Sequence, residues 1–235
     1  MPCYQLDERL WFPPVSAAEE YGLLAVGGDL SVERLLLAYR LGIFPWYSEG
    51  EPILWWSPDP RCILLPSQIH LSRSLRKTVR RNVFTVSFNR NFEQVIRSCR
   101  ESRIGAQREG TWILPDMEAA YIRLHRRGYA HSVECWQGDE LAGGLYGVCM
   151  GRCFFGESMF SRRTDASKVA LAWLARSLED AGFALIDCQQ TTEHLLSLGA
   201  QNVSRQRFLS LLDSGEVGSE HPLVSRFPLS PVVPV

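Results

Sequence analysis

The feature that most limits what this chain can fold into is a change of hydrophobic period near residue 130. Before this point apolar residues recur at helical spacing, and after it they alternate as they do in half-buried strands. The alternation predicts three strands, at His131 to Trp136, Leu141 to Val148 and Arg152 to Glu157, with a turn at residues 137–140 between the first two. The second half of the chain therefore contains a β-sheet.

Helices precede and follow these strands. The clearest are a helix that Ser31 caps and Gly42 ends, a helix that begins at Pro115, and a long helix from Ala166 to Ala181. The other predicted elements are strands at Phe84 to Phe88 and Ala184 to Cys188 and helices at Phe92 to Arg100, Glu193 to Leu198 and Val203 to Leu212. This order predicts a mixed α/β (α+β) fold with a small N-terminal domain over residues 1–65 and a larger domain over residues 66–235, which ends in a loose, Pro-rich tail.

Two segments of the small domain, Gly42 to Tyr47 and Ile53 to Arg61, are rich in proline and tryptophan. So many of these residues close together argue against a regular helix and against a central strand. Two interpretations stay open, a rigid packed aromatic loop or a wall that faces a ligand.

Composition limits the compartment and the cofactors. Asp7 and Glu8 stand where a signal peptide would be apolar, and no apolar run approaches the roughly eighteen residues that span a bilayer, so we expect a soluble, cytoplasmic protein. Seven scattered cysteines predict free thiols. Cys149 and Cys153 lack a second pair, and no histidines are spaced as ligands, so we expect no metal.

Positive charge is concentrated in the middle of the chain. Residues 67–130 hold 13 basic and 5 acidic residues, although the net charge of the whole chain is −1. Five of the basic residues recur at helical spacing and would form one stripe: Arg73, Arg76, Lys77, Arg80 and Arg81. A solvated helix face would look the same, but like charges at this spacing repel one another, which favours phosphate binding.

The residues best suited to chemistry lie at the ends of two apolar strands. One strand ends in Asp187, Cys188 and Gln189, and alternation puts Asp187 and Gln189 on one face and the Cys188 thiol on the other. No histidine is placed to activate Cys188, which argues against a nucleophilic thiol. The common hydrolase, phosphate-loop, zinc-protease and dinucleotide motifs are absent.

Glu157 follows another apolar strand and allows two interpretations. If the two strand ends are neighbours, Glu157 and Asp187 form an acidic patch in an apolar pocket. Alternatively, Glu157 pairs with Arg162 or Arg163 at the surface. The spacing alone does not decide between them.

Ten segments between residues 21 and 199 together resemble the leucyl/phenylalanyl-tRNA-protein transferase family. Their composition is unusual, and they occur in the family's order, so the resemblance is specific. The segments are Gly22 to Leu30, Gly42 to Trp46, Ile53 to Arg61, His70 to Arg73, Glu109 to Ile113, His131 to Glu134, Gly143 to Gly147, Gly156 to Ser161, Ala166 to Lys168 and Ile186 to Gln189.

The resemblance implies a GNAT-like acyltransferase domain after the small N-terminal domain. It also implies the reaction, in which Leu or Phe, and less readily Met, moves from aminoacyl-tRNA to the N-terminal amine of proteins that begin with Arg or Lys and marks them for degradation. The expected partners are therefore aminoacyl-tRNA and acceptor proteins. No cofactor is needed, because the aminoacyl ester is already activated.

Roles for single residues also follow from the resemblance. Asp187 would orient Gln189, whose side-chain oxygen would accept a hydrogen bond from the attacking amine, and Glu157 would attract the cationic acceptor. The other roles are contact with the 3′-terminal adenosine by Trp112 and Tyr121, an aminoacyl pocket of Leu145, Phe154 and Met159, and tRNA phosphate binding by the stripe from Arg73 to Arg81.

Two positions depart from the family pattern, and two other functions compete with it. Thr192 stands where an asparagine is expected, and Leu145 replaces a methionine. An acetyl-CoA-dependent acetyltransferase would need a glycine-rich pyrophosphate turn, which residues 161–168 lack. A non-catalytic RNA-binding module would explain the basic stripe but not Asp187, Gln189 and Glu157.

Overall fold

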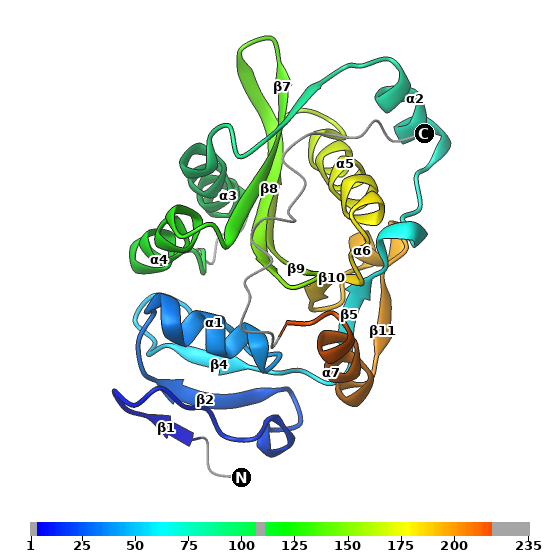
Figure 1. Ribbon diagram of the computed structural model, residues 1–235. Coiled ribbons are helices and arrows are strands. Elements are labelled where there is room, and N and C mark those ends of the chain that lie inside the picture. The colour runs from blue at the N-terminus through cyan, green and yellow to red at the C-terminus, as the bar shows by residue number, and fades with distance from the viewer. Residues whose placement is uncertain (1–3, 107–110, 218–235) are drawn as a thin grey trace.

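Two β-sheets organise the chain, one in each of two packed units (Figure 1). The computed structural model describes residues 4–106 and 111–217. The smaller sheet has the strand order β1-β2-β4-β3, and the larger one has the order β11-β5-β10-β9-β8-β7-β6. With helices packed on these sheets, the mixed α/β class predicted from the sequence is confirmed.

The N-terminal unit is a small sheet covered by one helix. Its strands are β1 (Tyr4–Leu6), β2 (Leu23–Gly27), β3 (Phe44–Pro45) and β4 (Leu54–Trp56), and a short 3-10 helix, η1 (Val15–Ala17), follows β1. Ser31 caps α1 (Val32–Arg40) as predicted, because its Oγ accepts the backbone N–H of Arg34 at 3.3 Å. The prediction that the tryptophan-rich segment holds no central strand is wrong. β4 lies between β2 and β3. It can pair on both sides because its three residues include no proline.

Three long antiparallel strands form the centre of the larger sheet, as the alternating pattern predicts. They are β7 (Ala130–Gln137), β8 (Glu140–Met150) and β9 (Cys153–Ser161). The chain then crosses through α5 (Ala166–Asp180) to β10 (Leu185–Gln189), which pairs with β9 in parallel. This register places Phe155 beside Asp187, so Glu157 and Gln189, each two residues further along, come to the same place on the sheet.

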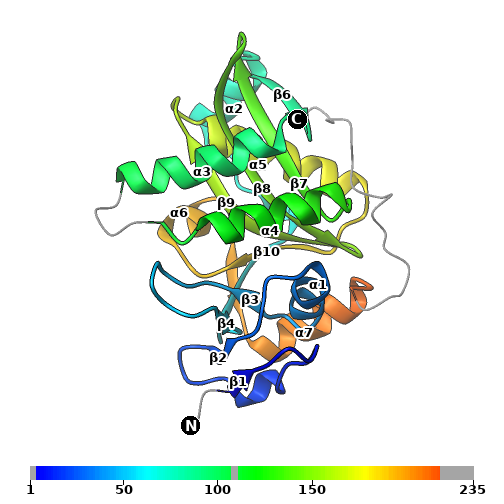
Figure 2. The ribbon, with the colours of Figure 1, turned by 90° about the vertical axis from the view of Figure 1, so that its left-hand side faces the viewer.

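Helices cover both faces of this sheet (Figures 1 and 2). On one face lie α3 (Phe92–Ala106) and α4 (Pro115–Arg126), which begins at the predicted proline. On the other face lie α5 and α2 (Arg73–Arg80), whose Leu75 and Val79 are buried. Gly147 lets β8 and β9 approach closely, because a Cβ there would come within 2.6 Å of the Phe154 ring.

The chain passes from one sheet to the other between Trp56 and Arg61. Strand β5 (Arg61–Leu64) pairs with β10 in the larger sheet, so the expected boundary after residue 65 falls one strand too late. The remaining elements of the larger unit are η2 (Pro66–Gln68), β6 (Thr85–Phe88), α6 (Glu193–Ser197), β11 (Gln201–Val203) and α7 (Arg205–Ser214).

Helix α7 returns to the N-terminal unit and packs against it. Its buried Phe208 and Leu212 lie in the same core as residues of that unit, and Phe208 comes so close to Gly42 that a Cβ there would meet the ring at 3.0 Å. The predicted Pro-rich tail lies outside the described residues. Within residues 4–106 and 111–217, no helix is both long enough and apolar enough to cross a membrane.

Candidate active site

A cavity of about 450 Å³ opens where the two units meet, and it contains most of the predicted site residues. The loop around β3 forms one wall with Phe44, Pro45 and Trp46. The larger unit supplies the other wall, including Trp112, Leu145, Phe154, Glu157, Met159, Asp187, Gln189 and Thr192. Side chains more than a hundred residues apart in the sequence thus surround one hollow.

Glu157 is buried, and its carboxylate accepts three hydrogen bonds. The hydroxyls of Tyr39 and Tyr121 each donate at 2.8 Å, and the Gln189 side-chain amide donates at 2.9 Å. Burial raises the pKa of Glu157 to about 7, although these three donors oppose the rise. The carboxyl group can therefore gain or lose a proton near neutral pH. Of the two interpretations left open by the sequence, the pocket is the right one.

The alternative partners of Glu157 pair elsewhere. Arg162 lies 3.2 Å from Glu101, and Arg163 lies 2.9 Å from Glu140. Glu157 therefore contributes its charge to the pocket and not to a surface ion pair.

Asp187 holds the backbone of Gln189. The carboxylate is completely buried, and its Oδ1 accepts the backbone N–H of Gln189 at 2.9 Å. Gln189 has a φ of 62°, a left-handed conformation that costs energy in a non-glycine residue and that this bond stabilises. As a result the Gln189 amide nitrogen faces Glu157, and its oxygen is left as the acceptor of that amide group.

The pairing of this strand is irregular next to Asp187. Its pairing with β5 shifts register between Asp187 and Gln189, and Cys188 lines the pocket together with both neighbours. The Cys188 thiol itself lies beside Cys62 on the neighbouring strand β5. A hydrogen bond with Cys62 and burial raise the pKa of Cys188 well above its ordinary value, which disfavours a reactive thiolate.

The apolar part of the pocket is built from the residues expected to hold an aminoacyl group. Leu145, Phe154 and Met159 all line it, and Trp112 lies at its border. Thr192, one of the two departures, also lines it and caps α6 by accepting the Leu195 N–H at 3.2 Å.

Tyr121 has a different place from the one expected. Its side chain is completely buried, so the ring has no surface on which an adenine could stack, and its hydroxyl contacts Glu157 and Tyr39 instead. In this structure Tyr121 therefore supports Glu157, and its contact with adenosine stays a prediction.

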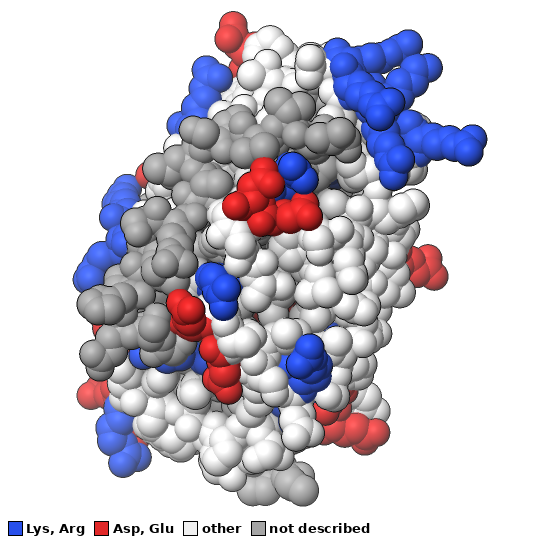
Figure 3. Space-filling view, turned by 45° about the vertical axis from the view of Figure 1, so that its right-hand side comes forward, with Lys and Arg blue, Asp and Glu red and all other residues white. Residues whose placement is uncertain are grey.

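The basic stripe forms a patch of its own. Arg73, Arg76, Lys77, Arg80 and Arg81 are exposed, and within the described part of the chain none of them pairs with a carboxylate. Figure 3 shows Lys and Arg side chains gathered at the corner of the molecule where α2 lies, with no acidic side chain among them. Ser72 caps this helix through the Leu75 N–H at 3.2 Å.

A second hollow, of about 610 Å³, lies beside the start of α3. Its lining is mainly polar, and its charged residues are largely paired with one another, as Arg97 is with Glu93 at 3.1 Å. None of the residues predicted for the site lines it.

Two residues that contact the predicted site residues escaped prediction, Tyr39 and Arg61. Tyr39 looks like part of the apolar face of α1, and its hydroxyl meets Glu157 only in the folded chain. The sequence offers one signal that could have marked Arg61 as part of the site, because Arg61 is a charged residue at the start of an apolar strand. It forms a buried ion pair with Asp187, 126 residues away.

The two interpretations of the tryptophan-rich segments, a packed loop or a wall that faces a ligand, each hold for one tryptophan. Trp55 is packed and donates to the Gly27 carbonyl at 2.9 Å, whereas Trp46 faces the pocket.

Comparison with known proteins agrees with this architecture. A model described as leucyl/phenylalanyl-tRNA protein transferase matches residues 63–213, and one described as the N-terminal domain of the same protein matches residues 28–59. The two matches meet where the chain passes between the sheets.

Three relatives, each named leucyl/phenylalanyl-tRNA–protein transferase, are similar over nearly their whole length. The chain is 63% identical to the protein of Syntrophobacter fumaroxidans over 90% of both chains. It is 58% identical to that of Desulfatibacillum aliphaticivorans, over 90% of this chain and 91% of the relative, and 57% identical to that of an Azoarcus species, over 92% of both.

The two-unit fold, its buried site and these matches define an aminoacyltransferase. More specifically, the chain belongs to the leucyl/phenylalanyl-tRNA protein transferase family.

Proposed function

We propose that this protein transfers Leu or Phe, and less readily Met, from aminoacyl-tRNA to the N-terminal amine of proteins that begin with Arg or Lys, and so marks them for degradation. The observation that carries the proposal is the contact between Glu157 and Gln189, 2.9 Å apart in a pocket with apolar walls. A carboxylate suits a cationic acceptor, and the apolar walls suit a leucyl or phenylalanyl side chain.

In the proposed reaction the neutral α-amine attacks the ester carbonyl carbon of the aminoacyl group. A C–N bond forms, the C–O bond to the terminal ribose breaks, and the proton lost by the amine moves to the ribose oxygen that leaves. The α-amine has an ordinary pKa of about 8, so part of it is already neutral at pH 7. Positioning is therefore the main task of the enzyme.

Gln189 is the proposed positioning group for the amine. Its nitrogen is engaged by Glu157 and its backbone by Asp187, so the side-chain oxygen is held in one orientation from which it can accept an amine hydrogen. Glu157, behind it, attracts the positive charge of the acceptor terminus, since no other carboxylate without a cationic partner lines the described pocket.

The aminoacyl-tRNA would lie across the same pocket. Leu145, Phe154 and Met159 would enclose the amino-acid side chain, and Trp112 would stack on the terminal adenosine. The basic stripe on α2 would bind acceptor-stem phosphates without reading sequence.

A transfer assay tests the donor and acceptor classes together. Radiolabelled Leu-, Phe-, Met- and Ala-tRNA would each be mixed with peptides that begin with Arg, Lys, Ala or Asp. We expect product with Leu and Phe donors, less with Met, and only with Arg or Lys acceptors. Transfer from Ala-tRNA at the rate of Leu-tRNA, or to Asp-initiated peptides, would contradict the proposal.

A second assay tests the proposed role of Asp187. We expect Asp187→Ala to lower kcat while the affinity for Phe-tRNA, measured by filter binding, stays within about threefold of the wild-type value. If affinity and turnover fall together, Asp187 is structural only.

A further inference from the structure

Arg61 lies at the centre of the junction between the two units. Its side chain is 1% exposed, although it begins a strand of the larger sheet at the edge of the N-terminal unit. A buried guanidinium group is costly unless every face of it is satisfied. Here all three of its nitrogens have hydrogen-bond partners, and two aromatic rings lie against the planar group.

The nitrogens bind in two directions. Nε donates to Oδ1 of Asp187 at 2.9 Å, and Nη2 donates to Oδ2 at 2.7 Å, which makes a two-pronged pair with a completely buried carboxylate. Nη1 donates to the backbone carbonyl of Gly42 at 3.2 Å. Arg61 thus ties the end of β10 to the loop that leads into β3.

Two aromatic rings enclose the planar group. The Arg61 Cζ lies 4.8 Å from the ring centroid of Phe44 and 4.4 Å from that of Phe208. Phe44 is part of the pocket wall, and Phe208 belongs to α7. The guanidinium group is therefore held against a ring of the pocket wall and a ring of α7.

This orientation reaches Gln189 through Asp187. The Oδ1 of Asp187 that binds Nε of Arg61 also accepts the Gln189 backbone N–H at 2.9 Å. Gln189 is the residue with the left-handed backbone. A carboxylate free to rotate would release that N–H, and the Gln189 side chain would lose its fixed approach to Glu157.

We propose that Arg61 is a positioning residue for aminoacyl transfer, which holds Asp187 in the one rotamer that fixes Gln189 in the pocket and joins this group to the Phe44 wall. This inference rests on the proposed function, because it requires Gln189 to act in the transfer. Arg61 itself touches no substrate.

Arg61→Lys is the main test. Lysine keeps the positive charge but cannot make the two-pronged pair or the planar stacking, so Asp187 is neutralised without being oriented. We expect kcat to fall by about tenfold or more, with the KM for Phe-tRNA within about threefold of the wild-type value. Urea unfolding would show that the variant is folded under the assay conditions.

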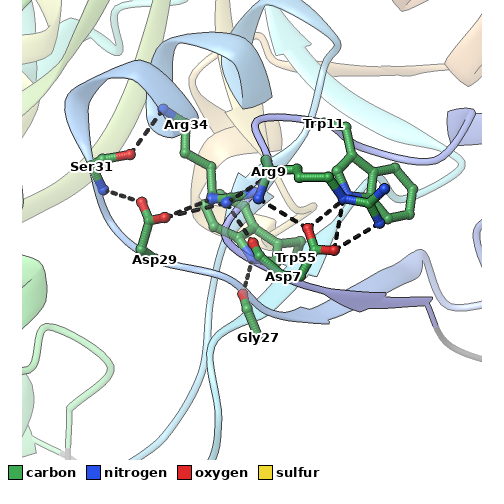
Figure 4. Close-up of polar contacts among 8 residues, drawn as sticks. All are labelled: Asp7, Arg9, Trp11, Gly27, Asp29, Ser31, Arg34 and Trp55. Carbon is green, nitrogen blue, oxygen red and sulfur yellow. Dashed lines mark hydrogen bonds and ion pairs between the residues drawn. The ribbon is translucent and has the colours of Figure 1, made fainter.

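Arg34→Lys is the matched control. Arg34 is also 1% exposed and also joins distant parts of the chain, since it binds Asp29 at 3.2 Å and the backbone carbonyls of Asp7 and Arg9 (Figure 4). It does not line the pocket. We expect a loss of stability in this variant but a kcat within about twofold of the wild-type value. Equal losses of kcat in both lysine variants would overturn the proposal.

Asp187→Asn, alone and combined with Arg61→Lys in a double variant, tests whether Arg61 acts through Asp187. This test does not depend on the single variant Arg61→Lys alone. If Arg61 acts through Asp187, adding Arg61→Lys to Asp187→Asn should lower kcat by less than about threefold further. Losses that multiply would show that Arg61 acts independently of Asp187 and would overturn the inference.

Gln189→Ala separates this inference from the proposed function. If Gln189→Ala loses transfer while Arg61→Lys keeps it, only the role of Arg61 fails. If Gln189→Ala keeps the wild-type kcat, the proposed function of the glutamine fails, and the role of Arg61 fails with it.

Discussion

Glu157 should make the protein less stable as the pH rises, and Glu157→Gln should remove this effect. The pKa of the carboxyl group is raised from 4.5 to about 7, because burial disfavours its charged form. Between these values the folded protein holds a proton that the unfolded chain has released. The free energy of unfolding therefore falls as the pH rises through this range.

The size of the effect follows from the shift. Each pKa unit corresponds to about 1.4 kcal/mol, and most of the shift lies between pH 5 and pH 8, so the contribution of Glu157 should change by about 2 to 3 kcal/mol over that interval. In Glu157→Gln nothing titrates at this position. The stability of the variant relative to the wild type should therefore rise by this amount from pH 5 to pH 8.

Urea unfolding of both proteins at the two pH values measures this difference. All other titrating groups are shared by the two proteins and cancel. Glu140→Gln, at the half-exposed first residue of β8, controls for the substitution itself. If the relative stability of Glu157→Gln is the same at both pH values within about 0.5 kcal/mol, the pKa of Glu157 is not raised and the burial argument is wrong.

Replacing Arg76, Lys77 and Arg80 together with Ala should weaken tRNA binding and reduce the salt slope of log K by about 2 to 3, and an unchanged slope would remove α2 from the tRNA site. Met159→Ala should raise the Phe-to-Leu ratio of kcat/KM by about tenfold, because leucine is too small to fill the added space, whereas an unchanged ratio would place the aminoacyl group elsewhere. Trp112→Ala should raise the KM for Phe-tRNA by about tenfold and Trp112→Phe much less, since stacking needs only an aromatic ring, and equal effects of the two would argue against stacking.

Elements with a clear period could be predicted from the sequence. The alternation from residue 130 onward predicted β7, β8 and β9, and Ser31 and Pro115 marked the starts of α1 and α4. Short strands could not be found in this way. β11, with the sequence QNV, and β4, with LWW, have three residues each, too few to show any period, and their place is set by the strands beside them.

The site was partly predictable for a related reason. Glu157 and Gln189 follow apolar strands, which marks them as candidates, but only the parallel register of β9 and β10 makes them neighbours. The irregular pairing between Asp187 and Gln189 could not be predicted from alternation. A phenolic hydroxyl such as that of Tyr39 gives no signal at all, because the ring fits an apolar helix face equally well.

The contacts of the N-terminal unit make it part of the site. Tyr39 on α1 donates to Glu157, and the β3 loop supplies the Phe44 wall. Arg61 of β5, which binds Asp187, also donates to the Gly42 carbonyl of the N-terminal unit. The contacts of Tyr39 with Glu157 and of Arg61 with Asp187 are buried, and Phe44 forms part of the wall of the same pocket. The larger sheet brings Glu157 and Gln189 together, but their orientation depends on groups that arrive from the other side. The two units should therefore be viewed as one catalytic structure, in which the smaller one fixes what the larger one brings together.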